Sequence, residues 1–442
     1  MNTSLAKKFN MKSLIVFAFP NMIMMIFLSL YTIIDGMFIS TFVGTDALSA
    51  TNMVYPVTSI EMAFSIMIAT GGSAVIAKKL GEGRQNEARS ILTALTILTA
   101  VLGTIVAVLS IVFLKPLIYL MGASQVQFDY CVTYLGILSA FVPFFLLETM
   151  FQIFFVTAGR PGLGLLVTAS AGITNIVLDY IFMGPLKMGV AGAAIATGIG
   201  HIVVSVCGAV FFAFAKNNSV RFFKPDFNIG IIIRAMLNGS SEMVTNTATA
   251  VTTFLFNYMF LKYYGEDGVA AITIVMYFQF VFTAIFFGYA NGVAPVISFK
   301  YGMQDIDQLK SIYRHSMTFI IVCSIGMFVL SIVSIGSVLK FFTSPDSGVY
   351  SLTLHGFRIF ATSFIIMGVS IFASSMFTAF SDGLVSAVIS FARTFIFLVG
   401  TILILPVFFG GEGVWFAIPV AELLGLFVSI FFLISKHKKY KY

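Results

Sequence analysis

About twelve stretches of 20 or more mostly apolar residues run through this chain, and they restrict its fold to that of a protein that crosses a membrane many times. Charged residues make up only 10% of the sequence, compared with about 25% in soluble domains. The connections are short, so we predict an all-α integral membrane protein without a separate soluble domain. The predicted spans begin near Leu14, Ala50, Ser90, Phe128, Gly162, Val190, Ile231, Val269, Ser311, Tyr350, Gly383 and Gly413.

Basic residues flank every second connection between the predicted spans. The other connections contain only Lys115, Lys187, Lys262 and Lys340. Because positively charged loops stay in the cytoplasm, we expect both termini there, with the first span retained rather than cleaved as a signal peptide. This orientation explains the net charge of +7, so we expect no nucleic-acid partner. The residues on the basic side are Lys7, Lys8, Lys12, Lys78, Lys79, Arg84, Arg89, Arg160, Lys216, Arg221, Lys224, Lys300, Lys310, Arg314, Lys436, Lys438, Lys439 and Lys441.

The two halves of the chain match at a constant spacing of 221 residues, half of its 442. GTDALSA at residues 44–50 aligns with GEDGVAA at 265–271, and Gly81 aligns with Gly302. Six spans per half leave both halves starting on the same side of the membrane, so the repeats are parallel. We therefore predict two pseudo-symmetric six-helix lobes, residues 1–221 and 222–442, with a substrate path between them. A duplicated membrane protein without transport activity is the alternative.

Four polar residues within the spans of the first half align with residues of the second half that lack polar side chains. A carboxylate inside a membrane span costs about 2.5 to 3.5 kcal/mol on insertion, so we expect such residues to have a function. The aligned pairs are Asp35 with Phe256, Asn175 with Ile396, Asp179 with Gly400 and Thr197 with Ile418.

The same four residues have the spacing of one pocket. Asn175 and Asp179 are four residues apart and so share a helix face, and Thr197 follows Ala193 by the same interval. If these faces converge on Asp35, two carboxylates, an amide oxygen and a hydroxyl form a site for Na⁺, a metal ion that prefers oxygen ligands, or for a proton. The residues do not choose between the two ions. Taken singly, Asn175 or Thr197 fits a hydrogen bond to a neighbouring backbone carbonyl equally well.

Other charged residues in the spans fit more than one role. Glu61, Glu148 and Glu242 could attract a cationic substrate into a cavity, or bridge helices near the membrane surface. The sequence lacks the motifs HExxH, GxxxxGK[ST] and GxSxG, and its four histidines have no ligand spacing. We therefore expect no enzymatic activity and no cofactor, and any pumping must use an ion gradient. A structural network is as consistent as a functional role for Arg358, Arg393 and Glu422.

Several motifs together resemble the MATE family (multidrug and toxic compound extrusion). They are Pro20 followed fifteen residues later by Asp35, GTDALSA at 44–50, AKKLGEG at 77–83, TAGRPG at 157–162, N-x-x-x-D at 175–179 and GVAGAAIAT at 189–197. The resemblance covers nearly the whole chain and is closer to the DinF- and MepA-type prokaryotic branch than to the NorM type. Positions where the NorM type has further acids, near residues 247–252 and Met367, are uncharged here.

The resemblance implies a V-shaped bundle of twelve helices in the inner membrane of a prokaryote. It implies a monomer, surrounded by membrane lipid, that exports cationic amphipathic compounds in exchange for Na⁺ or H⁺. The family's cation site falls on Asp35, Asn175, Asp179 and Thr197. A tyrosine associated with that site falls on Tyr134, and Pro20 matches the proline at which the first helix is proposed to bend.

Two other functions are open at this stage. The first is a flippase for lipid-linked sugars of the same superfamily, although such proteins tend to have basic cavities. The second is a channel or a membrane protein that transports nothing. The predicted function is that of an antiporter that exports small organic cations by alternating access.

Overall fold

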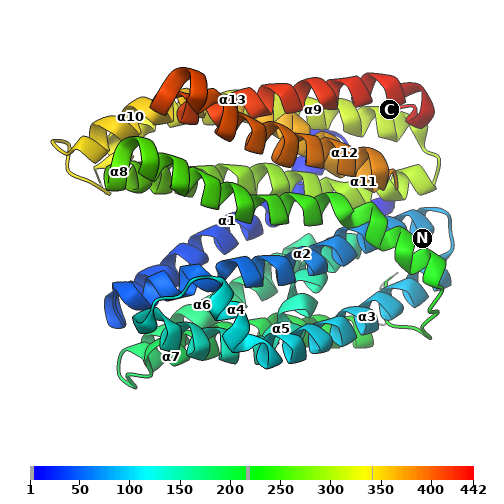
Figure 1. The fold of residues 1–442 in the computed structure, drawn as a ribbon. Helices are drawn as coiled ribbons and strands as arrows, with labels where there is room; N and C mark the ends of the chain where they lie inside the picture. Colours follow the sequence, from blue (N-terminus) through cyan, green and yellow to red (C-terminus); the bar gives the residue numbers. More distant parts are fainter. Residues whose placement is uncertain (1–3, 216–219, 341) are drawn as a thin grey trace.

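The computed structural model describes residues 4–215, 220–340 and 342–442, and the basic residue Lys216 lies outside these ranges. The described residues form helices and connecting loops. Figure 1 shows the helices as two bundles side by side, α1 to α7 in one and α8 to α13 in the other. The longer helices of the first bundle are α1 (Met11–Phe42), α2 (Thr45–Gly81), α3 (Gln85–Val112), α5 (Gln125–Thr157), α6 (Pro161–Met183) and α7 (Gly189–Phe214), with the short α4 (Leu114–Leu120) between α3 and α5.

The second bundle contains two chain segments that reverse direction. Helix α8 (Ile229–Gly302) would be about 110 Å long if it were straight, but Gly265 breaks it with non-helical backbone angles. Gly410 breaks α13 (Leu398–Tyr440) in the same way. The remaining elements are α9 (Ile306–Leu339), α10 (Gly348–Ala361), α11 (Phe364–Ala379), α12 (Gly383–Phe391) and the π turn η2 (Ala392–Phe397) that joins α12 to α13.

The reversals give the predicted number of spans. Among the described residues, nine helices are long and apolar enough to cross a membrane, and the bent pair α10 and α11 adds a tenth span. Each reversal divides one of the nine in two, which brings the total to the predicted twelve. The glycines that allow this occupy equivalent positions in the repeat: Gly44 and Gly265 have φ of 122° and 67°, and Gly189 and Gly410 have φ of 59° and 57°. The predicted all-α membrane architecture with two repeats is confirmed.

The helix starts have local causes in the sequence. The Asn10 side chain accepts a hydrogen bond from the Ser13 backbone N–H at 2.9 Å, and the Ser13 hydroxyl accepts one from the Asn10 N–H, which forms a capping box at the start of α1. Ser124 and Gln127 form the same arrangement at α5. Pro161 occupies the first turn of α6, where its missing N–H removes no helical hydrogen bond. Local polar and proline signals thus define where these mostly apolar helices begin.

Close contacts between α2 and α8 join the two bundles. A methyl group added at Gly81 would overlap the Phe299 backbone, and one added at Gly302 would overlap the Lys78 backbone. Residues 78 and 299, like residues 81 and 302, are 221 positions apart. Each contact is therefore repeated with the two lobes exchanged, as at a two-fold symmetric interface.

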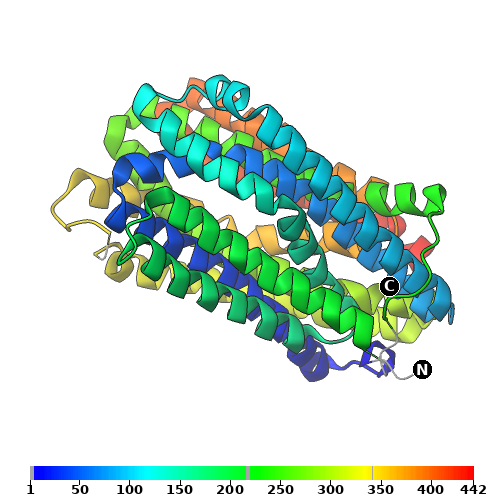
Figure 2. The ribbon, with the colours of Figure 1, turned by 90° about the horizontal axis from the view of Figure 1, so that it is seen from below.

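A second pair of contacts between the bundles is also repeated with the two lobes exchanged. Gly71 approaches the backbone of α8 at Gly239, and Gly292 approaches Ala18 of α1 so closely that a methyl group added at Gly292 would lie 3.1 Å from the Ala18 Cβ. We call these contacts, together with those at Gly81 and Gly302, the glycine seam. It lies in the half of the bundle nearer both chain termini (Figures 1 and 2).

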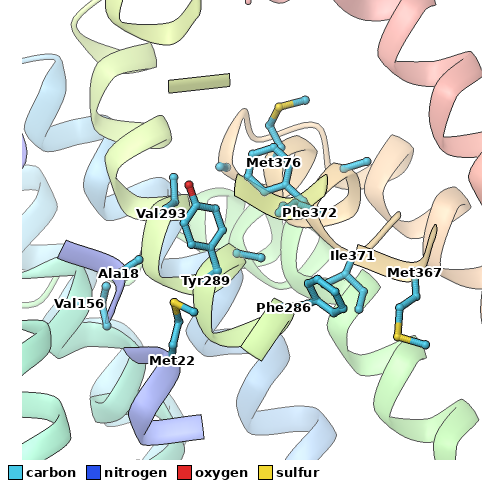
Figure 3. Packing of buried hydrophobic residues seen from close by; sticks show 14 of the residues in the cluster. Ala18, Met22, Val156, Phe286, Tyr289, Val293, Met367, Ile371, Phe372 and Met376 are labelled. Atoms are coloured by element: carbon cyan, nitrogen blue, oxygen red, sulfur yellow. The ribbon is translucent and has the colours of Figure 1, made fainter. Parts of the chain in front are cut away.

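Apolar packing continues from the seam into the second lobe. Figure 3 shows Ala18 and Met22 of α1 beside Tyr289 and Val293 of α8 in one buried cluster. Helix α1 runs without interruption through Pro20 in this region, so the predicted bend at Pro20 stays a prediction. The division at residues 221 and 222 is likewise a prediction that the fold leaves open.

Candidate ion-binding site

Two carboxyl groups of the first lobe lie together in the half of the bundle remote from the termini. Asp35 is in the second half of α1 and Asp179 is near the end of α6, and their side chains are close enough to share a proton. Asp179 is fully buried. Neither of its carboxyl oxygens, nor Oδ1 of Asp35, has a hydrogen-bond partner among the described residues. Buried oxygens without donors are costly unless a proton or a cation lies between them.

An amide and a hydroxyl lie beside this pair. The Asn175 Nδ2 donates to the Thr197 Oγ1 at 3.4 Å, which connects α6 to α7. Asn175 is 2% exposed, and its Oδ1 has no partner within the described ranges. Gly200 of α7 faces α6 at this point, where a methyl group added to it would make an ordinary contact of 3.7 Å with the Asn175 Cβ. The structure therefore brings together the four residues that the sequence pattern had grouped.

Two tyrosines face the carboxyl pair. The buried side chain of Tyr134 lies within electrostatic range of both Asp35 and Asp179, as the family resemblance implies. Tyr31 lies within the same range of both carboxyl groups and of Glu148. Tyr31 was missed at the sequence level, although its position four residues before Asp35 places it on the same face of α1.

A second cluster of polar side chains lies next to the predicted ion-binding residues in the first lobe. Glu148 of α5 contacts the His201 Nδ1 of α7, and the Gln152 Nε2 donates to the other Glu148 oxygen at 3.0 Å. Glu61 of α2 accepts a hydrogen bond from the Ser110 hydroxyl of α3 at 3.2 Å and lies within electrostatic range of His201. His201 was missed because its partner is 53 residues away in the sequence. Its position four residues after Thr197 was the available signal.

A small cavity lies between Asn175 and Thr197 on one side and the Glu148–His201 contact on the other. Its volume is about 10 Å³, and its polar lining is formed by Tyr31, Glu148, Thr168, Asn175, Thr197 and His201. Glu148, grouped at the sequence level with two other possible cavity acids, therefore shares a cavity with two of the predicted cation ligands. The arrangement offers hard oxygen ligands and titratable groups in one apolar lobe, which suits Na⁺ or protons. Asp35, Asn175, Asp179 and Thr197 are the residues that would hold the ion.

Comparison with known proteins assigns the family. The sequence model of one family, described as MatE, matches residues 20–181 and again residues 242–403, which together are well over half of the chain. This chain belongs to the MatE family. The two matches are one per lobe, in agreement with the repeat.

Curated relatives of this MatE protein are similar along its whole length. It is 24% identical to the multidrug export protein MepA of Staphylococcus haemolyticus, over 96% of this chain and 93% of that protein. It is 23% identical to MepA of Staphylococcus aureus, over 93% of this chain and 91% of that protein. The predicted placement in the MepA-like branch is confirmed.

Solved structures share the fold. A crystal structure of MATE in complex with MaL6 superposes with a TM-score of 0.93 at 21% identity, with 98% of each chain covered. A Pyrococcus furiosus transporter of the MOP superfamily, described as having a binding pocket of reverse polarity, superposes with a TM-score of 0.91 at 22% identity, with 98% of each chain covered. Proteins with pockets of different polarity thus share this fold, so the charges of the MatE pocket itself must decide what it binds.

The remaining predicted acid of the MatE chain lies elsewhere. Glu242 is buried in α8 and lies within electrostatic range of Arg393 in the second lobe. Its equivalent in the first lobe is Asn21, whose Nδ2 donates to the Gly288 carbonyl at 2.6 Å across the lobe interface. Arg393 itself forms a buried bidentate pair with Glu422, with nitrogen to oxygen distances of 2.7 to 3.0 Å. Glu242 therefore lies apart from the carboxyl pair of the first lobe.

Proposed function

We propose that this protein is a cation-coupled antiporter that exports cationic amphipathic compounds from the cytoplasm by alternating access. The observation that carries the proposal is the pair of Asp35 and Asp179, whose buried oxygens lack donors among the described residues. Membership of the MatE family and the name of the MepA relatives, multidrug export protein, support export of varied compounds. We also propose that both termini are cytoplasmic and that the protein is a monomer in the inner membrane of a prokaryote.

The proposed cycle exchanges one occupant of the first lobe for another. In a state open to the outside, Na⁺ or H⁺ enters between Asp35 and Asp179, lowers the negative charge of the pocket and so weakens the binding of a cationic drug. Reorientation of the lobes then exposes the ion to the cytoplasm. This coupling requires only that ion and drug stabilise different arrangements of the same helices.

Helix α1 is the element suited to transmit the exchange. It contains Asp35 at one end and, at the other, Ala18 and Met22, which pack against Gly292 and Gly288 of the second lobe. Pro20 lies between Ala18 and Met22, within the lobe contact, and removes one helical hydrogen bond, which favours bending there. A change of charge at Asp35 can thus alter the lobe contacts through a single helix.

The energy available depends on the number of ions exchanged. Exchange of one monovalent cation for one proton moves no net charge, so one unit of pH gradient supplies about 1.4 kcal/mol, or a tenfold drug gradient. Each additional charge would supply about 2.3 kcal/mol per 100 mV of membrane potential. The stoichiometry therefore sets the drug gradient that the cell can maintain.

The test is export of the fluorescent cation ethidium from proteoliposomes with the pH gradient and the Na⁺ gradient collapsed separately. We expect one collapse to stop export, which identifies the coupling ion. Asp35→Asn should abolish gradient-driven export, whereas Asp46→Asn, on an exposed residue at the start of α2, should leave it unchanged. Export by Asp35→Asn at the wild-type rate and expression level would refute the coupling role.

The same vesicles separate the proposal from its rivals. An antiporter loaded with unlabelled substrate takes up labelled substrate faster, whereas a channel shows no such stimulation. A flippase for lipid-linked sugars would transport an anionic lipid and leave ethidium untouched. The carboxyl and imidazole groups of the first-lobe pocket favour the cation exporter.

A further inference from the structure

Glu148 and His201 are two titratable side chains in contact with each other. The exchange proposed at Asp35 and Asp179 does not involve them. Both side chains are largely buried, at 9% and 11% exposure, and they line the same small cavity as Asn175 and Thr197. The Asn175 Oδ1 in this cavity has no hydrogen-bond partner among the described residues. A cavity of about 10 Å³ with several polar walls has room for about one water molecule, which can carry a proton to the imidazole.

At the equivalent positions of the second lobe, the positively charged side chain is an arginine. At the spacing of 221 residues, Gly172 corresponds to Arg393 and His201 corresponds to Glu422. The Arg393 guanidinium fills this place and holds Glu422 through both of its carboxyl oxygens. Arginine does not lose its proton in proteins, so this pair has a fixed charge. In the first lobe the Phe27 ring packs against the glycine, and the partner of the buried carboxylate is an imidazole, the side chain that ordinarily changes charge near neutral pH.

Other titratable side chains contribute to the electrostatic potential at Glu148 and His201. Tyr31 lies between the two polar groups, within electrostatic range of Glu148, Asp35 and Asp179. On the side of helix α2, Glu61 lies within electrostatic range of His201. The Ser110 hydroxyl, which donates a hydrogen bond to Glu61, carries no charge. The titratable groups facing the pair are thus Tyr31 from α1, Glu61 from α2 and, beyond Tyr31, Asp35 and Asp179.

We propose that Glu148 and His201 form a second proton-binding site, so that each exported monovalent cation is exchanged for two protons. This inference rests on the proposed antiport and assigns its stoichiometry. When the His201 Nδ1 donates its hydrogen to the Glu148 carboxylate, the Nε2 takes up the incoming proton, and the net charge of the pair changes from −1 to 0. The other proton is shared by Asp35 and Asp179. A drug cation in the first lobe repels both bound protons, and binding of the drug therefore releases them.

The first experiment counts protons on the purified protein in detergent. Saturating ethidium is added in weakly buffered solution near pH 7, and released protons are measured with an indicator dye. We expect release by wild type to exceed that by His201→Gln or Glu148→Gln, by up to one proton per drug bound. His355→Gln is the matched control, because His355 pairs with Glu412 at 2.9 Å on the exposed part of the second lobe. Equal release by wild type and both pocket variants, with ethidium still bound, would overturn the proposal.

The second experiment measures voltage dependence in proteoliposomes at a fixed pH gradient. Two protons per drug cation move one net charge, so an imposed potential of about 60 mV should change the final ethidium gradient about tenfold. His201→Gln should retain pH-driven export but lose this voltage response, and Glu148→Gln serves as a second variant if His201→Gln does not fold. A wild type that exports on a pH gradient without responding to voltage would overturn the two-proton stoichiometry and leave the antiport intact. A wild type that exports on a Na⁺ gradient but not on a pH gradient would also overturn the two-proton site, whereas a wild type that exports on neither gradient would overturn the proposed function.

Discussion

The close contact of α1 with α8 at Gly288, one turn from Gly292 of the glycine seam, predicts that a single methyl group at the lobe interface destabilises the protein. In Gly288→Ala, the new Cβ would lie 2.5 Å from the Met22 Cα, whereas ordinary contacts begin at 3.4 Å. Helices α1 and α8 must therefore separate locally by about 0.9 Å. Overpacking of this kind costs about 1 to 3 kcal/mol. The shift also loosens the hydrogen bond between Asn21 and the Gly288 carbonyl, a bond that contributes about 1 kcal/mol.

The matched control makes the same substitution where there is space. Gly326 lies within α9, and a methyl group added there would have no neighbouring atom within 4 Å, so Gly326→Ala should gain about 1 kcal/mol of helix propensity without a clash. The comparison of the two variants isolates the packing term, because both make the same change within a helix. Thermal unfolding of both variants in the same detergent measures it. We expect Gly288→Ala to melt below wild type and Gly326→Ala to melt at or above it. Equal melting temperatures for the two variants would refute the close approach of the lobes.

Three further predictions concern the lobe contacts, the ion pair and the orientation. Ala18→Cys combined with Gly292→Cys, in a background without the natural cysteines, should form a disulfide on oxidation and stop export until it is reduced, because the proposed alternating access requires the seam to open; export at the full rate by the cross-linked protein would contradict this. Arg393→Met should lower the free energy of unfolding by about 3 to 5 kcal/mol, because it leaves Glu422 buried without its partner, and Arg393→Met with Glu422→Leu should recover most of that loss in the same melting assay. A tag placed after Tyr442 should be reached by protease in inverted membrane vesicles and protected in intact cells, as both termini on the cytoplasmic side require.

The sequence was sufficient to predict the spans and the repeat because both depend on patterns that survive in a biased composition. Spans require only about 20 apolar residues, and the constant spacing of 221 residues places Gly44 with Gly265 and Gly189 with Gly410, the pairs that the structure uses for its turns. The grouping of Asp35 with Asp179 was predictable because unpaired acids in a membrane need partners. The reversal within α8 was predicted as the break between the spans that begin near Ile231 and Val269, and the structure adds that a single glycine, Gly265, turns the chain there.

The contact of His201 with Glu148 was not predictable in the same way. Helical spacing relates residues on one helix, whereas this contact depends on how α5 and α7 pack against each other. A structural network that includes Arg393 and Glu422 was one of two roles that the sequence left open, and the structure shows these two side chains paired between the π helix Ala392–Phe397 and α13. Sequence spacing thus identified ligands on single helices, and the packing of different helices decided which side chains meet.

The exchange symmetry of the seam has a consequence for the origin of this chain. Residues 18 and 71 of one lobe meet residues 239 and 292 of the other, so each lobe presents both members of every contact. Two copies of an ancestral half could therefore have associated as a dimer before fusion. In such a dimer both subunits would have carried the same ion-binding residues. Within one chain the two halves are free to differ, as the carboxyl pair of Asp35 and Asp179 in the first lobe and the pair of Arg393 with Glu422 in the second do.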